Sequence, residues 1–165
     1  MGLDMYLYRK TYVQNWEHQT PEQRHTISVK LGDNAREDIK PHRIAYIVEQ
    51  IGYWRKFNAL HGWFVENCGN GVDECQQIEV SAHDLRVLLE TLREVKRAIE
   101  NKDSKTIAML LPPVGGFFFG STELMNTYKT DVDDYYKEQV NETIAIIEEA
   151  IDEGEHEEFY YQASW

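Results

Sequence analysis

Between Trp54 and His61 the chain carries aromatic and polar side chains whose spacing suits a planar, hydrogen-bonding ligand. In a helix, at about 100° per residue, Trp54, Asn58 and His61 lie on one stripe at positions i, i+4 and i+7. Arg55 and Lys56 add positive charge to the same turn. A stripe made only for burial favours Leu and Val, whereas an indole, an amide and an imidazole together suit a ligand. Alternatively, the indole and imidazole pack at the margin of the core and each finds one hydrogen bond.

A second candidate is the glycine-rich segment 115–122, which reads GGFFFGST. Glycines let backbone N–H groups approach a ligand, and we expect a short helix from Thr122 whose N-terminus would favour an anion. Gly120 and Ser121 would then close over a phosphate. The segment matches neither the P-loop nor the dinucleotide-binding pattern, so a turn that feeds phenylalanines into the core is the alternative. Three consecutive phenylalanines cannot share one face of a strand, so Phe118 or its neighbours must face another element, a ligand or a second subunit.

The last seven residues, FYYQASW, form a third candidate. Chain ends normally fray and carry polar residues, whereas this end places Trp165 beside the terminal carboxylate. We therefore expect it to dock into the core, against a second subunit or against a ligand. Tyr160, Gln162 and Trp165 are its candidate binding residues.

The sequence favours neither a metal site nor a recognisable catalytic centre. His61, Cys68, Cys75 and His83 are seven, seven and eight residues apart, whereas structural zinc normally uses tight pairs such as C-x₂₋₄-C. No G-x-S-x-G or H-E-x-x-H motif occurs. We assign no catalytic residue, metal ligand or cofactor. If the protein is an enzyme, His61 is the best candidate general base.

Composition and charge restrict the class of protein. The 165 residues are 42% apolar and 12% aromatic, which predicts one globular domain spanning residues 1–165. Residues 131–165 hold twelve acids against Lys137 alone, a balance of −11, while the rest is nearly neutral within a total of −12. This asymmetry argues against duplex nucleic acid as a partner. The start lacks a signal-peptide pattern, and no stretch has the ~20 apolar residues that span a bilayer, so we expect a cytoplasmic protein that does not bind membranes.

Hydrophobic spacing predicts an α+β fold with a single, largely antiparallel sheet covered by two or three helices. The expected strands are 3–12, 25–31, 44–51 (a buried strand), 76–80 and 158–165, and the last could return to the sheet beside the first. The expected helices are 52–67, 81–101, a short one from Ser104 to the proline pair, and 131–152. Ser81 and Asp84 resemble a capping box at the start of the clearest helix. In the last helix, Tyr135 is expected to face inward.

Five segments, MGLDMYLYRK, GYWRKFNALHGWFVEN, GVDECQ, GGFFFGS and FYYQASW, follow one another along the whole chain. Together they resemble a family of small uncharacterised proteins from bacteriophages and bacterial genomes. The resemblance implies a phage-type protein made in the cytoplasm of a host bacterium. Proteins of that kind often interfere with host defence, some by sequestering nucleotide-derived signals.

Three functional hypotheses follow. The leading one is a non-enzymatic protein that sequesters a small nucleotide-derived immune signal. Trp54 would stack on the base, Asn58 and His61 would bond its edge or ribose, and Arg55 or Lys56 would meet phosphate. The alternatives are an acidic interaction module, whose helix 131–153 occupies a basic surface of a host protein, and a hydrolase of the same ligand that uses His61. The aromatic segments Phe117–Phe119 and Tyr160–Trp165 further predict a homo-oligomer.

Overall fold

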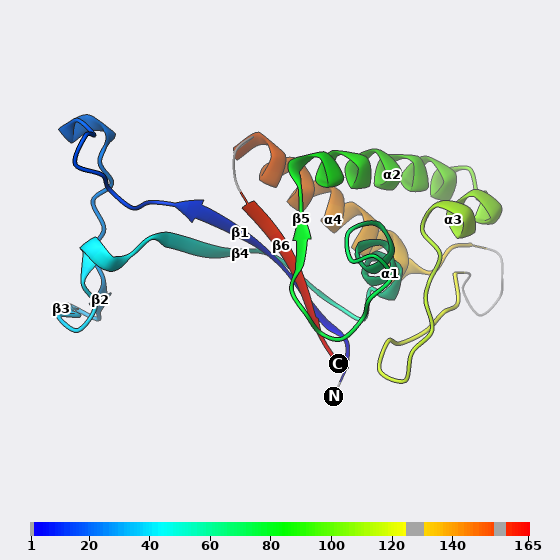
Figure 1. Ribbon diagram of the computed structural model, residues 1–165. Helices are drawn as coiled ribbons and strands as arrows, with labels where there is room; N and C mark the ends of the chain where they lie inside the picture. Colours follow the sequence, from blue (N-terminus) through cyan, green and yellow to red (C-terminus); the bar gives the residue numbers. More distant parts are fainter. Residues whose placement is uncertain (1, 125–130, 154–157) are drawn as a thin grey trace.

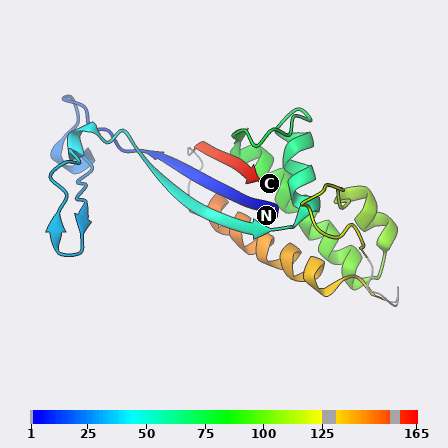
Figure 2. The ribbon, with the colours of Figure 1, turned by 90° about the horizontal axis from the view of Figure 1, so that it is seen from below.

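The computed structural model describes residues 2–124, 131–153 and 158–165. Its centre is a four-stranded antiparallel sheet in the order β4-β1-β6-β5, with helices on one face (Figures 1 and 2). The four strands are β1 (Asp4–Tyr12), β4 (Tyr46–Arg55), β5 (Ile78–Val80) and β6 (Glu158–Ser164). The predicted α+β fold with a largely antiparallel sheet is confirmed.

The alternation of side chains along β1 sets the two faces of the sheet. Leu3, Met5 and Leu7 are fully buried against the helices, while Tyr6 and Tyr8 point to the opposite, partly exposed face. The chain end returns as β6 and pairs antiparallel with β1, in a register that sets Asp4 opposite Ser164. The expected position of the terminal strand is therefore correct.

Helices α2 (Ala82–Glu100) and α4 (Asp134–Glu153) pack against each other and form most of the cover. At the start of α2, Ser81 Oγ accepts the Asp84 N–H, and Asp84 Oδ2 accepts the Ser81 N–H, so the expected capping box is present. Two shorter helices, α1 (Asn58–Asn67) and α3 (Ser104–Leu110), complete the layer. None of the described helices is both long enough and apolar enough to cross a membrane.

The expected helix over 52–67 is wrong in its first third. Gly52–Arg55 belong to β4, because they pair with β1 in a register that sets Leu7 opposite Gly52, and α1 begins only at Asn58. The strand expected over 44–51 exists, but it is not buried. Tyr46, Ile47 and Val48 are 39–49% exposed, because this end of the β1–β4 ribbon extends away from the helices (Figure 1).

Residues 13–45 form an arm at the far end of that ribbon (Figure 1). The arm contains two 3₁₀ turns, η1 (Pro21–Gln23) and η2 (Pro41–Arg43), and a hairpin of β2 (Lys30–Leu31) and β3 (Asn34–Ala35). The strand expected over 25–31 is thus reduced to its last two residues. Gly32, with φ +59°, makes the hairpin turn possible.

Two further expectations need correction. Thr122 does not begin a helix within the described residues up to 124, and residues 125–130 lie outside the described part. In α4 the inward side chain is Tyr136, 6% exposed, whereas Tyr135 is 45% exposed. Tyr136 lies four residues before the buried Val140 and shares its helix face, whereas Tyr135 lies five residues before it and does not.

Candidate functional site

A cavity of about 540 Å³ lies where β4 ends and α1 begins. Its volume falls in the range of roughly 300–1,000 Å³ that is typical of small-molecule sites. Five of the residues singled out in the sequence line it: Arg55, Lys56, Asn58, Gly120 and Ser121. The structure therefore brings together the basic turn and the glycine-rich segment, which are more than sixty residues apart in the chain.

Lys56 occupies an unusual position in this cavity. Its backbone adopts φ +60°, a left-handed conformation that costs a non-glycine residue about 1–2 kcal/mol. A Cβ at Gly120 would lie 3.3 Å from Lys56 Cβ, and a Cβ at Gly2 would lie 3.1 Å from Lys56 Cε. Two glycines thus make room for the lysine stem. Among the described residues its ammonium group forms no ion pair.

Asn58 holds the glycine-rich segment against α1. Its side chain is 4% exposed, and Nδ2 donates to the carbonyl oxygens of Phe119, at 3.1 Å, and Ser121, at 2.8 Å. Both amide protons are therefore used within the protein. Asn58 therefore shapes the cavity wall. The sequence-based hypothesis needs its NH₂ group to bond a ligand, but that group is already used within the protein.

The remaining wall comes from residues that the sequence did not indicate as binding residues. They are Phe57, Pro113, Glu123, Asp133, Tyr135 and Tyr136. The Tyr135 hydroxyl donates to the carbonyl oxygen of Arg55, which ties α4 to the end of β4. Burial raises the pKa of Tyr135 and of Tyr136, so both hydroxyls remain protonated donors at neutral pH. The sequence could have indicated this wall through the tyrosine pair at the start of α4, but the expectation from its spacing turned Tyr135 inward in place of Tyr136.

The cavity contains charges of both signs. Arg55 Nε lies 3.8 Å from Asp4 Oδ1, so this guanidinium has a partner on β1. Asp133 Oδ2 accepts the Tyr136 N–H at 3.1 Å near the start of α4. With Glu123 also at the wall, the cavity offers two cations and two carboxylates. It suits a molecule that carries both an anionic group and hydrogen-bond donors.

Trp54 lies in the core and not in the cavity. It is 1% exposed, and its indole covers Gly52, where a Cβ would lie 2.5 Å from Trp54 Cη2. Its Nε1 has no hydrogen-bond partner among the described residues. The stripe of Trp54, Asn58 and His61 does not form, because the first residue is on a strand and the other two are on a helix.

His61 is also a core residue, 1% exposed. Its Nδ1 lies 2.7 Å from the Tyr161 hydroxyl and its Nε2 lies 3.0 Å from Asp73 Oδ2. The rings of His61 and Phe119 pack edge to face, with their centroids 4.9 Å apart. Both ring nitrogens are occupied inside the protein, away from the lining of the cavity.

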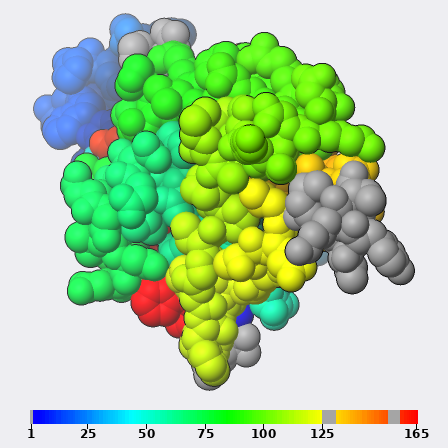
Figure 3. Space-filling model, turned by 90° about the vertical axis from the view of Figure 1, so that its right-hand side faces the viewer, coloured from blue at the N-terminus to red at the C-terminus, as the bar shows by residue number. Residues whose placement is uncertain are grey.

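The other predicted residues lie outside the cavity. The Phe118 carbonyl accepts the Leu3 N–H, Gln162 Nε2 donates to the Cys75 carbonyl, and the Trp165 ring lies 6.3 Å from that of Phe119. Figure 3 shows the segment 111–124, in yellow-green and yellow, crossing this side of the molecule beside the red chain end. The three phenylalanines form no strand, and Phe117 is 95% exposed.

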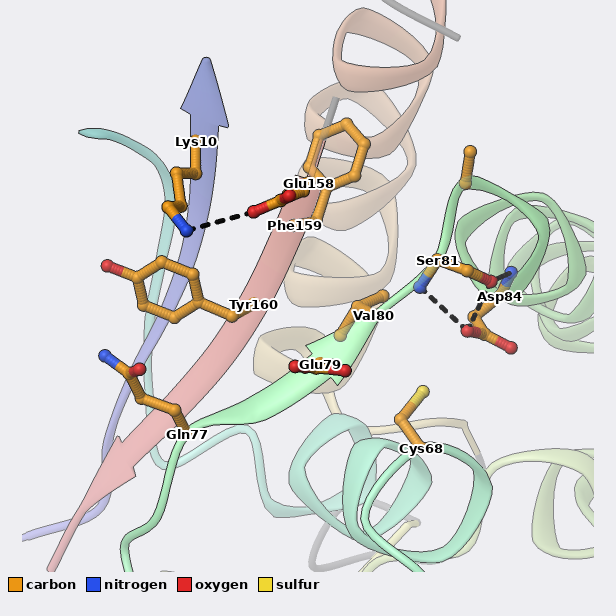
Figure 4. Close-up of a pocket in the computed structure, with 11 residues that line it drawn as sticks. Lys10, Cys68, Gln77, Glu79, Val80, Ser81, Asp84, Glu158, Phe159 and Tyr160 are labelled. Carbon is orange, nitrogen blue, oxygen red and sulfur yellow. Dashed lines mark hydrogen bonds and ion pairs between the residues drawn. The ribbon is translucent and has the colours of Figure 1, made fainter. Parts of the chain in front are cut away.

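A larger hollow of about 1,060 Å³ lies along β5 and β6 and includes Tyr160 (Figure 4). Three of its four charged groups already serve the fold: Lys10 Nζ lies 3.0 Å from Glu158 Oε2, and Asp84 caps α2, whereas Glu79 has no ion-pair partner among the described residues. Burial raises the pKa of the Cys68 thiol to about 12, so this thiol is unreactive. The smaller cavity is the better candidate for a small ligand.

No group of three or more His, Cys, Asp or Glu side chains in the described ranges could hold a metal ion. Comparison with known proteins found no matching family model, no matching curated protein and no matching solved structure.

Proposed function

We propose that this protein binds a small, phosphate-bearing, nucleotide-derived molecule in the cavity at the end of β4 and sequesters it without cleavage. The observation that carries the proposal is Lys56. At the cavity wall this residue combines a strained backbone with two flanking glycines. Its ammonium group has no ion-pair partner among the described residues. Backbone strain of this kind clusters at active sites and ligand clamps, and of the four non-glycine residues with a left-handed backbone in the described part only Lys56 lines this cavity.

Each part of the ligand has a matching group in the cavity. The Lys56 ammonium and the Arg55 guanidinium would meet phosphate oxygens, with the Ser121 hydroxyl as a further donor. The exposed part of the Tyr135 ring offers the stacking surface that Trp54 does not provide. Glu123 and Asp133 would accept hydrogen bonds from sugar hydroxyls or base amino groups.

Sequestration fits the geometry better than hydrolysis. A general base must come within hydrogen-bond reach of the reacting group, whereas His61 is buried and bonded on both ring nitrogens. The acidic interaction module also gains no support. Glu148 lies 2.9 Å from Arg93 of α2, so part of the acidic face of α4 holds the two helices together.

The biological setting is part of the proposal. The five segments that resemble phage and bacterial proteins support a role in a host bacterial cytoplasm, where a protein that removes an immune signal would act against defence. Immune signals of this class are nucleotides, which agrees with a cavity that presents cations beside hydrogen-bond acceptors.

The decisive experiment is ligand release. The purified protein is mixed with a panel of linear and cyclic nucleotides, separated from free ligand, denatured and analysed by mass spectrometry. We expect one class of nucleotide to be recovered intact from the wild type and from Lys96→Met, a control on the exposed face of α2. Lys56→Met should lose most of the binding. Failure of the wild type to retain any nucleotide, or full binding by Lys56→Met, would overturn the proposal.

A further inference from the structure

The sheet face opposite the helices carries a continuous row of seven side chains, here called the tyrosine strip. It consists of Tyr6, Tyr8, Tyr12, Tyr46, Val48, Tyr53 and Tyr160. In Figure 4, Lys10 and Tyr160 lie on this side of the sheet, whereas Cys68 and Asp84 lie on the side of the helices.

The rings of the strip form two contacting groups, one on the body of the protein and one near the arm. Tyr6 lies 5.4 Å from Tyr53 and 6.0 Å from Tyr8, and Tyr8 stacks on Tyr160 at 4.8 Å. Beyond them, Tyr12 packs against Tyr46 at 5.2 Å. Val48 fills the step between the two groups, because the register sets it opposite Lys10.

Four residues of this surface are open to solvent, while Tyr6, Tyr8 and Tyr160 are half-buried. Tyr12, Tyr46, Val48 and Tyr53 are 39–49% exposed. Single exposed apolar residues are ordinary, but a contiguous row of tyrosines marks a surface for protein contact.

The charged groups beside the strip form ion pairs, except Glu79, which lies opposite Tyr160 and has no ion-pair partner among the described residues. Lys10 bonds Glu158 at 3.0 Å and lies 4.0 Å above the Tyr46 ring. At the other end, Asp4 accepts the Tyr53 hydroxyl at 2.7 Å and lies 3.8 Å from Arg55. The two ion pairs and Glu79 sum to −1, against −12 for the whole protein. A face so close to neutral does not attract a charged polymer, and it is where a second copy of an acidic protein meets the least repulsion.

We infer that the tyrosine strip is the interface of a two-fold dimer, in which two sheets pack face to face with their strands in opposite directions. A two-fold interface sets the same patch on both copies. Each end of the strip has one cation and one anion, so reversal places ion pair over ion pair. Six rings of about 150–250 Å² each, several of them two-fifths exposed, supply roughly half of the ~800 Å² that each side of a standard interface buries.

The arm would supply the rest of this interface. Because the strands are reversed, residues 13–45 of each copy lie against the body of the other copy. The arm has five acids and five bases, so it approaches the acidic body without net repulsion. The inference goes beyond ligand binding, and it moves the interface expected from the sequence: Tyr160 belongs to it, whereas Phe118 does not.

The test compares two valines of similar exposure, Val48 in the strip, at 49%, and Val87 on α2, at 43%. Light scattering at micromolar concentration should return twice the single-chain mass of 19.4 kDa for the wild type. Val48→Lys should weaken self-association by about 100-fold, because the interface would bury an unpaired ammonium. Val87→Lys should remain dimeric. Lysine lowers the net negative charge in both variants, so a loss in Val48→Lys alone cannot arise from repulsion between whole molecules.

The dimer and the ligand cavity are tested separately. Circular dichroism must show that Val48→Lys keeps the wild-type fold, and its nucleotide binding should be unchanged. Phe118→Asp should stay dimeric. A wild-type mass of 19.4 kDa, a dimeric Val48→Lys protein, or equal losses in both valine variants would each overturn the inference.

Discussion

The Tyr161 hydroxyl lies 2.7 Å from His61 Nδ1, and this contact joins β6 to α1 across a sequence separation of 100 residues. Burial is the main reason why the pKa of Tyr161 is raised, so the hydroxyl keeps its proton and donates it to His61 Nδ1. His61 Nε2–H then donates to Asp73 Oδ2 at 3.0 Å. Every polar atom of the buried imidazole is satisfied, which gives His61 a structural role.

Tyr161→Phe should destabilise the protein by about 1–3 kcal/mol, because it leaves a buried imidazole nitrogen without a partner. The melting temperature should fall by roughly 2–4 °C for each kcal/mol lost, as measured by calorimetry. Tyr160→Phe is the matched control, since the neighbouring ring lies on the open face. A Tyr161→Phe protein as stable as this control would show that the bond contributes little.

Stability should decrease at alkaline pH. Burial raises the pKa of Tyr136 and of Tyr161 in the folded state, whereas both ionise near ~10 when unfolded. Below that pH both states hold the protons and no difference arises. Above it the unfolded state releases protons that the folded state keeps, so the free energy of unfolding should fall by about 1.4 kcal/mol per pH unit for each tyrosine.

Urea unfolding at several pH values from neutrality to above ~10 locates the onset of this slope and measures it, and phenolate absorbance reports the ionisation. Tyr161→Phe should make the slope shallower by the contribution of one proton. A slope that is the same in Tyr161→Phe and wild type would refute the assignment.

Asn58→Asp should release the glycine-rich segment from α1. The substitution replaces two donated hydrogen bonds by a carboxylate facing two carbonyl oxygens, at a cost of about 1–3 kcal/mol. Chymotrypsin cleavage near the exposed Phe117 should accelerate by roughly tenfold or more, as the open population of the segment grows. Asn141→Asp, which changes one exposed bond on α4, is the control. Equal cleavage rates in the two variants would contradict the role of Asn58.

Lys56→Gly should separate stability from binding. Glycine relieves the left-handed strain of about 1–2 kcal/mol, which offsets its own entropic cost of roughly 0.5–1 kcal/mol. The melting temperature should stay the same or rise, while nucleotide binding measured by calorimetric titration should be lost. A clear fall in melting temperature would show that the lysine stem, packed between Gly2 and Gly120, stabilises the fold by itself.

The sequence alone determined the elements whose signals are local. The alternation of Leu3, Met5 and Leu7 produced β1, and the capping box at Ser81 began α2 where it was expected. The apolar chain end indicated a docked terminal strand. In each case the spacing of apolar residues and the residues that begin or end the element lie within one short segment. No distant residue is needed to determine its secondary structure.

The tertiary structure decided the site. Residues 52–55 have helical spacing with the segment that follows, yet pairing with β1 made them a strand and buried Trp54. Three features arise only when β4, α1 and α4 meet. Lys56 packs against Gly120, Asn58 bonds the glycine-rich segment, and the Tyr135 hydroxyl bonds the Arg55 carbonyl. Strand pairing and packing between distant segments override local propensity, because the free energy they contribute exceeds the fraction of a kcal/mol per residue that distinguishes helix from strand.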